Sequence, residues 1–158
     1  MKTVCKLLLA VAALAVPLSL PAQVIAKSTI GLELAKKIAA RAESEAAKNK
    51  WTMVIAVVDD GGNLIYLERM DGTQLGSIDV AQEKARTALK FKRPTKAFED
   101  VVAGGRTAIL SLPGVVAIEG GVPLLADGVI VGAIGVSGMK SAEDGVVAQA
   151  GAGAMSQP

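Results

Sequence analysis

The stretch that decides the fold is ADGVIVGAIGVSG, which occupies residues 126–138. Asp127-Gly128 is a turn signal, and the residues from Val129 to Val136 are β-branched and almost wholly apolar. A short run of this kind between turn residues predicts a strand buried on both faces, at the centre of a sheet. Its glycines lack side chains and let a helix, another backbone or a ligand come close. We therefore expect the exit loop, Ser137-Gly138, to lie near a ligand site.

The N-terminal segment, residues 1–26, is expected to be a signal peptide. A basic start precedes an unbroken apolar run over residues 7–16, and small residues then offer cleavage after Ala22 or Ala26. The apolar run is well short of the roughly 20 residues that span a bilayer, so no stable membrane insertion is expected after the signal is removed. The predicted location is periplasmic or secreted.

The remaining residues, 27–158, are enough for a single domain, whose tail we expect to fray from Gly151. The chain has no histidine, and its one cysteine, Cys5, would leave with the signal. The mature chain would then lack disulfides, thiolate nucleophiles, imidazole bases and the usual zinc ligands. No phosphate-loop or dinucleotide fingerprint is present, so the sequence indicates neither a nucleotide nor zinc as cofactor.

The charge balance bears on the choice of partner. Removal of the signal takes away Lys2 and Lys6, so the 17 basic residues fall to 15 and match the 15 acidic ones. A net charge near zero argues against nucleic acid as the main partner.

Hydrophobic periodicity predicts helices and strands in the order α-β-β-α-α-β-β-β-α. Strands are expected at residues 51–58, 64–70, 115–118, 122–126 and 129–136. Helices are expected at residues 30–49, 77–91, 95–102 and from 141 onward, with Ser77 capping the second of them. The short loops at 59–63 and 127–128 force antiparallel pairing of the strands they join. The sequence thus predicts an α+β domain with a five-stranded antiparallel sheet and helices packed against it. Pro123 lacks an N–H, which places its strand at an edge or leaves it half paired.

The order of several short motifs resembles that of the GlcG/HbpS family of haem-binding proteins. The resemblance covers the chain from about Thr29 to its end. Its motifs are Ala56–Asp59, Gly61–Leu64, Arg69–Gly72, Ser77 with Ala81, Lys84 and Thr87, Gly120–Pro123, Asp127-Gly128 and Gly132–Gly138. The resemblance implies a small domain with a five-stranded antiparallel sheet that assembles into oligomers. It also implies that family members bind haem, and that some degrade it.

Haem requires a flat apolar slot, an iron ligand and cations for its two propionates. With histidine and cysteine absent, the predicted iron ligand is Tyr66 or Met70. The alternative for Tyr66 is a strand tyrosine that packs on the sheet with its hydroxyl bonded locally. The residues predicted to bind the ligand are Tyr66, Arg69, Met70, Asp71, Ser77, Lys84, Gly121, Pro123 and Ser137.

Two charged features have both a functional and a structural interpretation. Arg69 and Asp71 flank Met70 at a strand end, where they could form part of a ligand site. In the structural interpretation they bond each other or cap the helix that begins at Ser77. A basic run follows in the second and third predicted helices, and it is either a solvated surface or an anion patch for propionates, a small carboxylate or an acidic partner. The run consists of Lys84, Arg86, Lys90, Lys92, Arg93 and Lys96.

The sequence favours a secreted, homo-oligomeric protein that binds haem or another tetrapyrrole. One alternative is an enzyme that acts on a small hydroxy or keto acid or degrades haem, and the lack of histidine and cysteine weighs against it. The other is a ligand-free oligomeric accessory protein of a membrane sensor, suggested by a high apolar content with few aromatic residues.

Overall fold

The computed structural model describes residues 25–156 and shows an α+β fold, as predicted. The elements in chain order are α1 (Leu32–Lys48), β1 (Val54–Asp59), β2 (Leu64–Arg69), α2 (Ser77–Phe91), α3 (Lys96–Ala103), η1 (Thr107–Ser111), β3 (Gly121–Ala126), β4 (Val129–Ser137), α4 (Ser141–Ala152) and η2 (Gly153–Ser156). No helix in this range is long and apolar enough to cross a membrane.

The sheet has four antiparallel strands in the order β2-β1-β4-β3. The strand that decides the fold, β4, pairs on both sides, which confirms its predicted central position. It is joined to β3 by a tight hairpin at Asp127 and Gly128, whose φ angles of 49° and 78° match the primed turns that suit the twist of a hairpin. The strand that contains Pro123 lies at the sheet edge, as its missing N–H predicted.

The fifth strand, predicted at residues 115–118, is wrong. The backbone of this segment is held by side chains of the neighbouring helices: the Val116 N–H donates to the Thr87 hydroxyl at 3.0 Å, and the Glu119 N–H donates to the Glu99 carboxylate. The backbone N–H groups of Val116 and Glu119 are therefore not free to pair with a neighbouring strand. The apolar run forms an irregular loop beside α2 and α3, and the sheet ends at β3.

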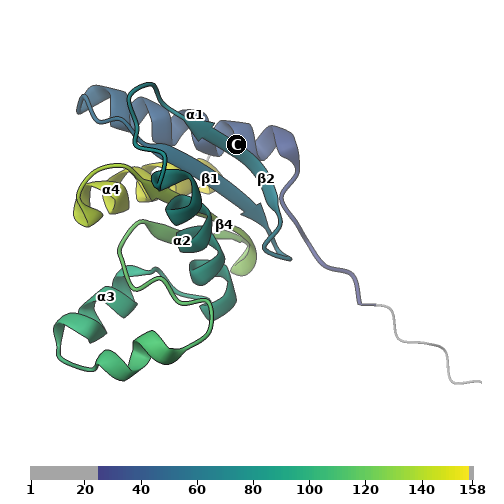
Figure 1. Ribbon diagram of the computed structural model, residues 1–158. Coiled ribbons are helices and arrows are strands. Elements are labelled where there is room, and N and C mark those ends of the chain that lie inside the picture. Colours follow the sequence, from purple (N-terminus) through teal and green to yellow (C-terminus); the bar gives the residue numbers. More distant parts are fainter. Residues whose placement is uncertain (1–24, 157–158) are drawn as a thin grey trace, which may run out of the picture.

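The helices lie in two layers, with α1 and α4 on one face of the sheet and α2 on the other (Figure 1). Alternate residues of β4 face the two helical layers. Ile134 and Val136 join the core under α1 and α4, whereas Ala133 and Gly135 face α2. A Cβ on Gly135 would collide with the Ala81 carbonyl oxygen and lie 2.6 Å from the Ala85 nitrogen. The glycine therefore allows the α2 backbone to lie directly on the sheet.

Two local expectations are corrected by the structure. Ser77 does not cap α2: the N-cap is Gly76, and the Ser77 hydroxyl instead accepts a hydrogen bond from the Ser137 hydroxyl at 3.2 Å. The chain does not fray from Gly151, which is helical and buried: an added Cβ there would lie 2.6 Å from Ile134 and 3.1 Å from Ala42. Helix α4 passes directly into η2, which contacts α1.

Candidate functional site

The sheet separates the residues that we predicted to form one site. Tyr66 and Met70 pack against the core beneath α1, on one face. Ser77 and Ser137 bond each other on the opposite face, where α2 lies. Neither group lines the described cavities of about 490, 220 and 400 Å³.

The other predicted residues lie at the two sheet edges. Arg69 and Asp71 are exposed at the end of β2, and no ion pair or side-chain hydrogen bond joins them in the described residues. Gly121 and Pro123 are buried in β3, at the far edge of the sheet. The candidate site must therefore be built around one of these regions.

Tyr66 is poorly prepared to act as an iron ligand. Its hydroxyl donates to Glu68 Oε2 at 3.0 Å, and this hydrogen bond, together with burial, raises the pKa of the phenol. A metal ligand of this kind binds in its deprotonated form. A raised pKa makes the phenolate harder to form, so the local structural interpretation of Tyr66 fits better.

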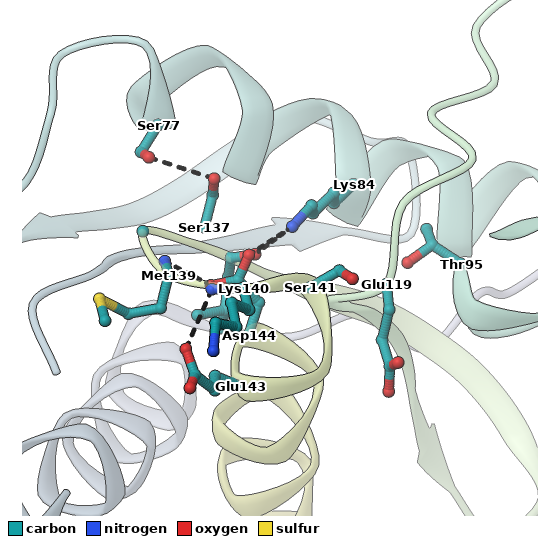
Figure 2. A network of polar contacts seen from close by, with 12 residues as sticks. Ser77, Lys84, Thr95, Glu119, Ser137, Met139, Lys140, Ser141, Glu143 and Asp144 are labelled. Carbon is teal, nitrogen blue, oxygen red and sulfur yellow. Dashed lines mark hydrogen bonds and ion pairs between the residues drawn. The ribbon is translucent and has the colours of Figure 1, made fainter.

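Lys84, the first member of the predicted basic patch, is not on the surface. Its side chain is only 1% exposed, and Nζ donates to Asp144 Oδ2 at 2.7 Å and to the Val136 carbonyl at 3.1 Å (Figure 2). Because the three residues belong to α2, β4 and α4, the ion pair joins both helical layers at the end of the central strand. In this arrangement Lys84 has a structural role.

The surroundings of the ion pair are closed by the protein itself. Asp144 also accepts the Met139 N–H at 3.0 Å, and burial raises the pKa of its carboxyl against the opposing effects of Lys84 and this N–H. Gly120, with φ of 127°, covers the pair so closely that a Cβ there would lie 2.9 Å from Lys84 Nζ. The ion pair thus positions the loop that enters β3.

A groove with a volume of about 490 Å³ runs along the free edge of β3. Its walls come from the α2–α3 loop on one side and from α4 and η2 on the other. The lining residues are Lys92, Pro94, Val122, Pro123, Leu125, Ile130, Gln149, Ala152, Gly153, Met155 and Ser156. A largely apolar concavity of this size with a few polar groups is typical of a small-molecule site.

A smaller pocket of about 220 Å³ continues this groove inward and shares Pro94, Val122 and Gln149 with it. Its own lining adds Lys96, Glu119, Gly120, Gly121 and Gly145. We call the two cavities the edge groove and the inner pocket. Of the residues predicted from sequence, Pro123 lines the first and Gly121 the second.

Sequence reasoning missed most of the groove. Leu125 and Ile130 looked like ordinary strand residues, and Met155 lies in the tail that we expected to fray. Two signals did point here: Lys92 and Lys96 belong to the basic run, and Pro123 indicated an unpaired edge. The groove exists because residues 152–156 pack beside the edge of β3, and the sequence does not reveal this packing.

The edge groove offers several of the features that haem requires. Most of its lining is apolar, Lys92 supplies a cation, and Met155 is the one methionine among the lining residues. A thioether is an established haem-iron ligand, although histidine and thiolate are commoner. Within residues 25–156, no group of three or more histidine, cysteine, aspartate or glutamate side chains is arranged to hold a bare metal ion.

Comparison with known proteins is consistent across sequence and structure. The family model described as "Haem degrading protein HbpS-like" matches residues 30–153. Protein GlcG of Escherichia coli K12 is 46% identical over 111 residues, which cover 70% of this chain and 83% of GlcG.

Two solved structures extend the comparison. A double mutant of HbpS from Streptomyces reticuli superposes with a TM-score of 0.77 at 33% identity, covering 85% of this chain and 92% of that one. The PduOC–haem complex superposes with a TM-score of 0.74 at 28% identity, covering 81% and 96% of the two chains. The resemblance inferred from the motifs is confirmed by these matches.

Proposed function

The chain belongs to the HbpS-like family of haem degrading proteins, and from this premise we propose that it binds haem or another tetrapyrrole in the edge groove. The observation that carries the proposal is the groove itself, a largely apolar concavity with Lys92 among its lining residues. The tetrapyrrole ring would lie against the apolar walls, with a propionate near Lys92. Met155 is the groove residue that would supply a ligand to the iron, whose redox and ligand chemistry would belong to the haem.

Titration of haemin into the purified protein is expected to give a saturable Soret change. Leu125→Asp, which places a charge in the groove, should weaken binding at least about tenfold, since burial of a leucine side chain contributes about 1.5–3 kcal/mol. Leu110→Asp is the matched control, because Leu110 is similarly exposed (55% against 49%) and lies on η1, outside the groove. Its affinity should equal that of the wild type.

The same titration identifies the iron ligand. Met155→Leu should shift the Soret maximum while the affinity changes little, whereas Tyr66→Phe and Met70→Leu should leave the spectrum unchanged. A shift in either of those two variants would instead move the site to the α1 face of the sheet. Equal weakening by Leu125→Asp and Leu110→Asp, or absorbance that never saturates, would refute binding in the groove.

We also propose that the protein is exported to the periplasm or beyond and acts as a homo-oligomer. Export is supported by the signal-like residues 1–26, of which 1–24 lie outside the described residues. Assembly is supported by apolar side chains exposed on the described surface, such as Leu75 and Val129. Native mass spectrometry of protein from its own host should report a chain cleaved after Ala22 or Ala26, more than one subunit and a retained tetrapyrrole. An uncleaved monomer would contradict both parts of the proposal.

A further inference from the structure

The inner pocket contains the carboxylate of Glu119, whose ion-pair partner lies beyond hydrogen-bond distance. The Glu119 side chain is 20% exposed, it accepts no hydrogen bond within residues 25–156, and Lys96 Nζ is 3.9 Å away. Burial raises the pKa of Glu119 against the opposing charge of Lys96, and the neighbouring charges of Glu99 and Asp100 act in the same direction as burial. A carboxylate held in this way favours a partner that brings both a positive charge and a hydrogen-bond donor.

The backbone around Glu119 is shaped to keep its carboxylate in the pocket. The Glu119 N–H is bonded by the Glu99 carboxylate, which also accepts the Ser141 hydroxyl at 3.0 Å. The side chain lies against Gly145 of α4, where an added Cβ would collide with Oε1. Figure 2 shows Glu119 directed away from the Lys84–Asp144 pair, so that cation is not its partner.

The local balance of charge decides what kind of ligand this pocket suits. Lys96 already pairs with Asp100 at 2.7 Å, so the other charged residue of the lining, Glu119, has no cation within hydrogen-bond distance, and the Glu99 carboxylate lies beside it at the Glu119 N–H. The other walls are apolar side chains or glycine backbone, chiefly Pro94, Val122 and Gly121. An anion would meet repulsion here, whereas an ammonium group on a short apolar body would complement both the carboxylate and the walls.

We propose that the inner pocket is a binding site for a small primary ammonium compound, whose ammonium group donates to Glu119 and whose carbon chain lies against Val122 and Pro94. This site is separate from the tetrapyrrole proposed for the edge groove, although the two cavities adjoin. Gln149, which lines both, would contact either ligand.

Three probes of equal chain length and different charge test this site: n-butylammonium, n-butanol and butyrate. In NMR titrations of the ¹⁵N-labelled protein, n-butylammonium should shift the amides of residues 119–121 saturably, at least about tenfold more tightly than the other two. Glu119→Gln keeps the shape and removes the charge, so it should weaken n-butylammonium binding at least about tenfold. Glu33→Gln, on the exposed surface of α1, should bind like the wild type.

The dependence on pH gives a second readout. Because the ammonium group needs the ionised carboxylate, affinity should fall as the pH is lowered through the raised pKa of Glu119, and Glu119→Gln should abolish this dependence. Leu125→Asp, designed to block the edge groove, should bind n-butylammonium normally, which separates this site from the tetrapyrrole proposal. Tighter binding of butyrate, or an affinity that Glu119→Gln leaves unchanged, would overturn the inference.

Discussion

Replacing Lys84 by methionine should destabilise the protein by about 3–5 kcal/mol, because it leaves the Asp144 carboxylate buried without its cation. Both side chains are almost completely excluded from water, so solvent cannot replace the lost partner. Methionine keeps most of the length and volume of lysine, which limits any contribution from an empty cavity. Urea denaturation followed by circular dichroism measures the loss, and Lys37→Met, at an exposed position of α1, should change stability by less than about 0.5 kcal/mol.

The loss in Lys84→Met should depend on pH in a defined direction. Without Lys84, the pKa of Asp144 rises further above its value in the unfolded chain, so the folded state takes up a proton more readily. The associated stability is present at low pH and disappears as the pH rises through the folded-state pKa. The deficit of the variant should therefore shrink as the pH falls toward about 4.

A double variant separates the ion pair from packing. Lys84→Met with Asp144→Leu removes both charges, and it should recover most of the loss, because an apolar pair often replaces a buried ion pair without net cost. Recovery should be incomplete, since the Met139 N–H then loses its acceptor. A double variant that loses as much as the two single variants combined would show that the charges do not act as a pair.

The central strand was predictable because its signal is local. A short apolar run bounded by Asp127-Gly128 has few other structures open to it, and Pro123 restricts its neighbour to an edge. The error at residues 115–118 has the opposite cause. Those residues have strand-like composition, but Thr87 accepts the Val116 N–H, and Glu99 accepts the N–H of the adjoining Glu119. Such competition between distant side chains and strand pairing is not visible in a pattern of residue types.

The candidate site was less predictable than the fold for a similar reason. Lys84 was grouped with surface cations because its partner, Asp144, is 60 residues away and looked like an ordinary residue at a helix start. Tyr66, on a predicted strand, and Ser137, in the predicted exit loop of another strand, were expected at one site, yet the sheet places them on opposite faces. Strand alternation assigns faces only when the register is known, and the bulge between Val57 and Val58 shifts that register in β1 and β2.

Gly135→Ala is expected to destabilise the protein by about 3 kcal/mol, the upper end of the usual cost of overpacking a core. The new Cβ would meet the Ala81 carbonyl oxygen and the Ala85 nitrogen, both of which are backbone atoms that no side-chain rotamer can move. Relief requires α2 to shift away from the sheet, which would loosen its contacts with Val54, Ala56 and Val58. Urea denaturation measures the change.

Gly76→Ala is the matched control for this substitution. Gly76 has φ of −59° and ψ of −23°, which any residue adopts, and a Cβ there would meet no atom within 4 Å. It should be neutral or stabilising by up to about 1 kcal/mol, through reduced freedom of the unfolded chain. If Gly135→Ala is equally mild, α2 does not depend on direct backbone contact with β4. If it is severe, the two helical layers are coupled through this glycine, because a shift of α2 also moves Lys84 away from Asp144 on the other layer.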